Sequence, residues 1–222
     1  SMVFQNSGEA CDPVQNIGYH FWETMNCHGE KRSKKECYTY AAALLKQLRM
    51  PDPERILKSY PFELSGGMNQ RVGIALAMVN NPQIILADEP TSALDVTVQM
   101  KVLKEMHDLR EEFKTSIVLV THSIGVVAQL CDIVGVMYAG RMVEWGTTEE
   151  LLSRPYHPYT KALIDAVPTE MGSDPVGING MPPDFGIQMS GCPFAPRCPY
   201  ASEECERIMP DQTYFGERRW AR

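Results

Sequence analysis

Two adjacent carboxylates, Asp88 and Glu89, follow directly on the apolar run at residues 84–87. Ligands of an open α/β sheet lie beyond the carboxyl ends of its strands, so this pair would stand at a binding edge. One carboxylate in such a place can hold Mg²⁺, and the next can act as a general base toward water. The alternative is that the two acids only begin a solvated loop.

A second candidate site is the turn Ser65-Gly66-Gly67, which precedes a predicted helix. The serine offers a hydroxyl, the glycines let backbone N–H groups approach a ligand, and the helix N-terminus adds partial positive charge. A plain serine N-cap followed by flexible glycines is the alternative. The 222 residues contain no Gly-Lys pair and therefore no phosphate loop of the form G-x-x-x-x-G-K-[ST]. The residues alone leave open which anion this turn would hold.

The elements that position these residues alternate between strands and helices. Helical spacing of apolar residues, interrupted by prolines and glycines, predicts helices over residues 36–49, 66–79, 95–113 and 123–132. Short apolar runs predict buried strands of a parallel sheet over residues 83–88 and 115–122. Two further strands are predicted within residues 133–146, joined at Ala139-Gly140-Arg141. This alternation implies parallel crossovers and an α/β fold.

Composition narrows the class of protein. The net charge of −7 and the pI of about 5.3 argue against broad nucleic-acid binding, but they do not exclude a small phosphate-bearing ligand. No run reaches the roughly 18 apolar residues that a membrane span needs. The N-terminus has no signal-peptide pattern, so a cytosolic chain is the expectation. Seven cysteines in such a chain are not expected to form disulfides.

A change of composition marks a boundary near Pro168. Seven of the 16 prolines and five glycines fall within residues 168–199, which a compact α/β core would not contain. We predict three regions, residues 1–65, residues 66–167, and a small loop-rich extension over residues 168–222. Of their boundaries, only the last follows from this change of composition.

Four short motifs occur in series: LSGGM at 64–68, LADEP at 86–90, SALD at 92–95 and THS at 121–123. Their order and spacing resemble the signature, Walker B, D-loop and H-loop of the ATP-binding-cassette (ABC) family. The stretch VFQ at 3–5 is similar to the strand end that carries the family's Q-loop glutamine, here Gln5. The resemblance implies part of a P-loop NTPase-like ATPase core with a parallel sheet, a helical subdomain within residues 1–65, and ATP and Mg²⁺ as cofactors.

The same resemblance implies roles for individual residues. Glu89 would be the general base, and His122 would contact the γ-phosphate and hold the attacking water, although a lone histidine is more often structural. Asp88 and Gln5 would serve the Mg²⁺ ion and its water. The signature residues would cap ATP held by a second cassette; they are Ser65, Gly66, Gly67 and Met68.

Asp95 would organise the contact between the two cassettes beside the ATP, and it is also a candidate N-cap for the following helix. In the family the lysine-bearing phosphate loop lies upstream of the Q-loop. This chain begins at the Q-loop. We therefore expect the 222-residue chain by itself to hydrolyse ATP poorly or not at all.

Longer stretches resemble the ATPases of dipeptide, oligopeptide and nickel importers: LSGGMNQRV at 64–72, LDVTVQ at 94–99, MYAGRMVEWG at 137–146 and HPYTKALIDAVP at 157–168. This branch implies a second cassette, either identical or different, transmembrane permease subunits, an indirect link to a substrate-binding protein, and a place at the cytoplasmic face of the membrane. A metal-chelate importer and a non-catalytic module that docks a permease or partner cassette remain alternatives. A cassette protein that acts on nucleic acid is disfavoured.

Three cysteines, Cys192, Cys198 and Cys205, lie in the extension, the first two within CPFAPRC. Thiolates at such spacing can hold an iron–sulfur cluster, and the resembling importers are thought to bind a four-iron cluster with a fourth cysteine. No fourth cysteine follows Cys205. Zinc is a weaker option, and reduced thiols in a proline-braced loop are the favoured alternative.

Overall fold

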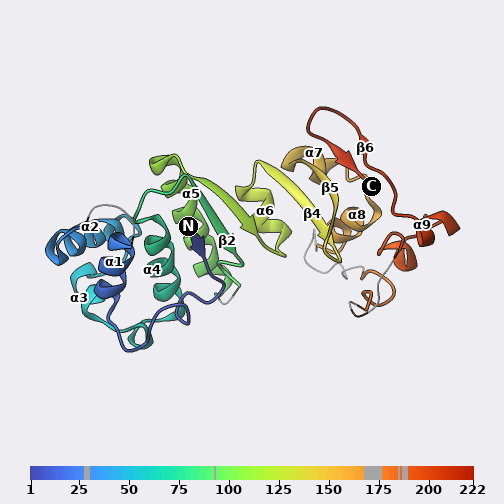
Figure 1. The fold of residues 1–222 in the computed structure, drawn as a ribbon. Helices are drawn as coiled ribbons and strands as arrows, with labels where there is room; N and C mark the ends of the chain where they lie inside the picture. Colours follow the sequence, from blue (N-terminus) through green and yellow to red (C-terminus); the bar gives the residue numbers. More distant parts are fainter. Residues whose placement is uncertain (28–30, 93, 168–176, 185, 187–189) are drawn as a thin grey trace. The chain divides into compact units, whose positions relative to one another are not determined.

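The computed structural model describes residues 1–27, 31–92, 94–167, 177–184, 186 and 190–222, with Val96 described by its backbone alone. The chain divides into two compact units, Ser1–His122 and Ser123–Arg222. Figure 1 shows the elements of both units in chain colours.

The first unit contains a cluster of helices that follows the first strand. Its helices are α1 (Ile17–Asn26), α2 (Lys34–Gln47), α3 (Pro53–Lys58), the short 3₁₀ helix η1 (Pro61–Glu63), α4 (Gly66–Met78) and α5 (Val96–Phe113). Local signals begin these helices: Ser33 and Glu36 form a capping box at α2, and Asp52 caps α3 immediately before Pro53. Phe21, Leu45 and Ile74 are fully buried in the hydrophobic core that the helices share with the sheet.

The sheet of the first unit has three parallel strands in the order β1 (Met2–Val3), β2 (Ile84–Asp88) and β3 (Ser116–Val120). Asp88 lies opposite Val120 in the register. Ile85 and Ala87 face the core, whereas Ile84 and Leu86 are about half exposed. The prediction that these strands are buried is therefore wrong for one face, because the helices of this unit share a core with the Ile85 side only.

The second unit is built on an antiparallel sheet with the strand order β4-β5-β7-β6. Its strands are β4 (Ile133–Tyr138), β5 (Arg141–Thr147), β6 (Thr213–Tyr214) and β7 (Trp220–Ala221). Its helices are α6 (Ile124–Leu130), α7 (Thr148–Ser153), α8 (Pro158–Asp165), the 3₁₀ helix η2 (Ala195–Arg197) and α9 (Glu203–Arg207). Tyr138, Val143 and Phe194 form its small core, and the Tyr138 ring meets the Phe194 ring edge-on at 5.2 Å between centroids.

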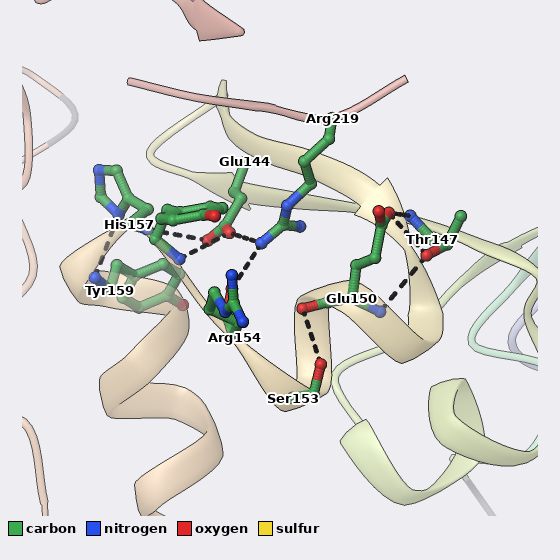
Figure 2. A network of polar contacts seen from close by, with 9 residues as sticks. Glu144, Thr147, Glu150, Ser153, Arg154, His157, Tyr159 and Arg219 are labelled. Carbon is green, nitrogen blue, oxygen red and sulfur yellow. Dashed lines mark hydrogen bonds and ion pairs between the residues drawn. The ribbon is translucent and has the colours of Figure 1, made fainter. Parts of the chain in front are cut away.

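A buried ion pair joins Glu144, in the middle of β5, to Arg219 (Figure 2). Glu144 of β5 is fully buried and accepts hydrogen bonds from the backbone N–H groups of Tyr156 at 2.9 Å and His157 at 3.0 Å. The Arg219 guanidinium donates to the same carboxylate and, at 2.8 Å, to the carbonyl oxygen of Arg154. Since Arg219 precedes β7, the pair ties the last strand to β5 and to the segment before α8.

Most predicted elements are confirmed. The helix from Gly66 ends at Met78, the helix after Asp95 ends at Phe113, and the β4–β5 turn falls at Ala139 and Gly140, both with positive φ. The α/β fold with a parallel sheet is confirmed as well. The compact division falls after His122, whereas Pro168 lies outside the described residues, so the three-region boundaries stay a prediction. In the described parts of the chain, no helix is both long and apolar enough to cross a membrane.

Candidate functional site

The carboxyl-terminal edge of the parallel sheet gathers residues from all three of its strands. Gln5 follows β1, Asp88 ends β2 with Glu89 next to it, and His122 comes two residues after β3. Because the strands are parallel and in register, these residues share one edge although they are up to 117 positions apart in the sequence. This is the place where ligands of open α/β sheets lie.

Glu89 and His122 are in direct contact across this edge. The Glu89 Oε1 atom lies 2.6 Å from the His122 Nδ1 atom and accepts a hydrogen bond from the His122 backbone N–H at 3.1 Å. An ionised carboxylate can only accept, so Nδ1 donates the hydrogen in this contact. The Glu89 side chain is 20% exposed and that of His122 is 79% exposed, so the imidazole stands open to a ligand.

The backbone at Glu89 is strained, with φ at +44°. A non-glycine residue in the left-handed region costs roughly 1–3 kcal/mol and persists only where its surroundings hold it. Here the Glu89 N–H donates to the Val120 carbonyl at 2.9 Å, and the Glu89 carbonyl accepts from the Ser92 N–H at 3.2 Å. This conformation turns the chain sharply at the end of β2 and places the carboxylate beside β3.

Ser92 connects Gln5 to this strained turn. The Gln5 amide Nε2 donates to Ser92 Oγ at 3.2 Å, and Ser92 Oγ donates to the Glu89 carbonyl at 3.1 Å. The Gln5 amide nitrogen is thus engaged, and its carbonyl oxygen is the atom suited to a cation. The sequence analysis gave Ser92 no role of its own. The feature that could have indicated one is its short hydroxyl side chain, two positions after the Pro90 that follows the acidic pair.

The signature turn begins α4 as predicted. Ser65 is the N-cap, and its Oγ accepts from the Met68 N–H at 3.4 Å. A Cβ atom on Gly67 would lie 3.0 Å from the Val98 side chain, so close packing against α5 accounts for that glycine. A Cβ atom on Gly66 would meet no described atom within 4 Å. No described part of this chain therefore occupies the space that the missing side chain of Gly66 leaves open.

Asp95 serves as the N-cap of α5, one of the two roles predicted for it. Its Oδ1 accepts from the Thr97 N–H at 3.1 Å and from the Val98 N–H at 3.0 Å. The starts of α4 and α5 meet at the Gly67–Val98 contact. In the described residues no hydrogen bond joins Ser65–Met68 to Asp88, Glu89 or His122, so these form two separate groups.

The three cysteines of the second unit do not form a metal site in the part of the chain described. There, no group of three or more His, Cys, Asp or Glu side chains is placed to hold a metal ion. Cys192 and Cys198 instead pack against the small core around Phe194, as cysteines often do. Burial raises the pKa of the Cys198 thiol. On Cys205, hydrogen bonding to Ser202 lowers the pKa.

Comparison with known proteins identifies the family of this chain. Residues 1–92 match the ABC transporter family, and residues 143–205 match the Oligopeptide/dipeptide transporter, C-terminal region. The oligopeptide transport ATP-binding protein OppD of Haemophilus influenzae is 42% identical over 218 residues, which cover 97% of this chain and 67% of that protein. The chain belongs to the ABC transporter ATP-binding family. Within it, this cassette carries the C-terminal region of the oligopeptide and dipeptide branch.

A second relative and a solved structure extend the comparison. The dipeptide transport ATP-binding protein DppD of Bacillus subtilis is 43% identical over 215 residues, which cover 96% of this cassette and 64% of the relative. A solved dimeric ATP-binding cassette, bound to ADP and Pi in a post-hydrolysis state, is 30% identical with a TM-score of 0.58. That match covers 66% of this chain and 62% of the solved one. The cassette thus spans about two thirds of the length of these relatives.

Proposed function

We propose that this chain forms part of the ATP-hydrolysing subunit of an importer for dipeptides and oligopeptides. The observation that carries the proposal is the Glu89–His122 contact at the carboxyl edge of the parallel sheet, 2.6 Å between Oε1 and Nδ1. A carboxylate positioned by an imidazole at a ligand-binding edge suits proton abstraction from water. Relatives that are 42–43% identical over the aligned residues are named for oligopeptide and dipeptide transport, which favours peptides over nickel as the cargo.

The residues divide the chemistry among them. Glu89 accepts the proton of the attacking water, and His122 Nε2 contacts the water or the terminal phosphate. Asp88, an exposed carboxylate at the end of β2, and the carbonyl oxygen of Gln5 are the hard oxygen ligands that suit Mg²⁺. Held by these residues, Mg²⁺ would supply positive charge against the phosphate oxygens.

A second cassette completes the site. Ser65, Gly66, Gly67 and Met68 present a helix N-terminus whose outer glycine has open space around it, so a phosphate held by another subunit can approach closely. This chain has no Gly-Lys loop to hold that phosphate itself. A dimeric solved relative bound to ADP and Pi supports this pairing. Asp95 would lie near the contact between the two cassettes.

The partners follow from the proposed transport role. Permease subunits would carry the peptide across the membrane, and the cassette would dock them peripherally at the cytoplasmic face. A substrate-binding protein would deliver the peptide to the permease. No nucleic acid is part of the proposal, since the chain is acidic with a net charge of −7.

The decisive test is Glu89→Gln in the full transport complex, with ATP hydrolysis measured at saturating ATP. We expect the rate to fall by roughly 10²–10⁴-fold, since the general base is lost while shape is kept. His122→Ala should lower it by a similar order, roughly 10²–10³-fold. Glu54→Gln, an equivalent change on the exposed face of α3, is the control and should leave the rate unchanged.

Full turnover by the Glu89→Gln complex would refute the assignment of the base. The 222-residue chain alone is expected to show no turnover, because it has no Gly-Lys loop. Hydrolysis by that chain in the absence of a second cassette would contradict the pairing.

A further inference from the structure

A hollow of about 320 Å³ lies in the first unit, away from the residues assigned to hydrolysis. Its lining comes from three helical segments: the end of α2, α4 and α5. The lining residues are Arg49, Arg71, Lys101, Lys104, Glu105 and Asp108. Nothing in the assigned nucleotide chemistry uses any of them.

Regular structure fixes the shape of this hollow. The four lining residues of α5 recur at helical spacing along one face of the helix, while Val102, Met106 and Leu109 turn the neighbouring face into the core. Arg71 projects from α4. Arg49 follows the end of α2 with φ at +52°, which turns the chain at this point. The cationic groups are therefore presented by elements that pack on a common core.

The charge of the lining is opposite to that of the whole chain. Four cationic and two acidic side chains give the hollow a formal charge of +2, in a chain whose net charge is −7. Glu105 is already engaged, because its Oε2 lies 2.7 Å from Arg71 Nε and both side chains are largely buried, at 8% and 16% exposure. That contact holds the guanidinium in place with further N–H groups available.

The other cations of the hollow have no anionic partner within the described residues. Lys101 and Lys104 stand four positions before Glu105 and Asp108, the spacing at which helix surface ion pairs form, yet neither pair comes within 4.0 Å in the structure as described. Arg49 likewise makes no described salt bridge. Arg49, Lys101 and Lys104 thus line one hollow, and none of the three makes a salt bridge within the described residues.

We propose that this hollow binds a compact anion carrying two or three phosphate groups. Its volume is at the small end of the range of ligand pockets, roughly 300–1,000 Å³, which suits a chain of two or three phosphates better than a bulky ligand. Guanidinium forks match phosphate oxygens in pairs, and ammonium groups add charge-assisted hydrogen bonds. The proposal does not depend on the proposed transport function.

Titration calorimetry of the full 222-residue chain with sodium tripolyphosphate, without Mg²⁺, tests this site. We expect saturable one-to-one binding, and a rise in Kd of roughly tenfold or more in the Lys101→Ala/Lys104→Ala double variant, since two charge-assisted contacts are removed. The matched control is Lys58→Ala/Lys161→Ala, which removes two exposed lysines elsewhere and should keep the Kd. Glu89→Gln should also keep it, which separates this site from the hydrolytic edge.

Circular dichroism melts of each variant establish that the fold is kept. Equal weakening in both lysine doubles would mean a general effect of net charge and would overturn the proposal, as would no binding of tripolyphosphate or pyrophosphate. Sedimentation with phosphatidylglycerol vesicles separates a lipid headgroup from a free phosphate. Vesicle binding that depends on Lys101 and Lys104, without binding of the soluble anions, would also overturn it.

Discussion

Each of the two units holds a carboxylate paired with a basic side chain. The two pairs differ in how far they are buried and in how many carboxylate oxygens are engaged. Glu144 and Arg219 in the second unit are 0% and 5% exposed, and every oxygen of the carboxylate is engaged. Glu89 and His122 in the first unit are joined at one oxygen and stand partly or mostly in solvent. A buried pair whose carboxylate oxygens are both engaged organises a fold, although the Arg219 Nη1 atom has no partner among the described residues. An open pair keeps atoms free for a ligand.

The largest expected effect is on the buried pair. Glu144→Ala leaves the Arg219 charge buried without a partner and removes the acceptor of two backbone N–H groups, so we expect a loss of about 3–5 kcal/mol of stability. Denaturant unfolding followed by tryptophan fluorescence measures it, since Trp145 and Trp220 pair across β5 and β7. In the control Glu203→Ala, which breaks an exposed pair with Arg207, stability should hardly change. An equal loss in both variants would remove the contrast between buried and open pairs.

A second test uses His157, next to the buried pair. Burial lowers the pKa of His157 to about 4, and its Nδ1 accepts from the Tyr159 N–H at 3.1 Å. Its unfolded pKa is near 6.5, so the unfolded chain binds the proton first. Stability is full above about pH 6.5 and falls by about 2–3 kcal/mol as the pH drops toward 4.

The control for that pH dependence is His157→Asn, which keeps an N-capping acceptor but does not titrate. The free energy of unfolding is measured at several pH values between 4 and 7. In the variant it should not show the fall toward pH 4 that is attributed to His157. If wild type and variant show the same pH profile, His157 is not the group that titrates.

The open pair makes a smaller and different prediction, about strain. Glu89→Gly and Glu89→Ala both remove the carboxylate, but only glycine adopts φ of +44° at no steric cost. The glycine variant should therefore be more stable than the alanine variant by about 1–2 kcal/mol. Denaturant unfolding of the two variants checks this, and equal stability would mean that the backbone at residue 89 is not held in the left-handed region.

The smallest effect is expected at Asp95. Replacement by alanine removes two hydrogen bonds to the first turn of α5 and should cost about 1 kcal/mol, whereas Asp95→Asn keeps the cap. Thermal melts compare the two. A loss in the asparagine variant as large as in the alanine variant would show that the charge, and not the cap, stabilises this turn.

The sequence by itself determined the chain order of four of the helices and four of the strands, and the ends of α4 and α5. Those features depend on local signals, such as Ser65 and Asp95 as caps and Gly140 at a turn, which act within a few residues. It also placed Asp88, Glu89 and His122 at strand ends, because short apolar runs mark where strands stop. A resemblance in four ordered motifs then indicated the family.

Only the tertiary structure decided which residues meet. The Glu144–Arg219 pair joins positions 75 residues apart, the exposed face of β2 depends on which helices pack beside it, and the two core thiols depend on Phe194. The same holds for the cationic hollow, where Arg49, Arg71 and Lys101 come from three segments. Local patterns set how each segment folds, but the partner of a buried charge is chosen by the packing of distant segments.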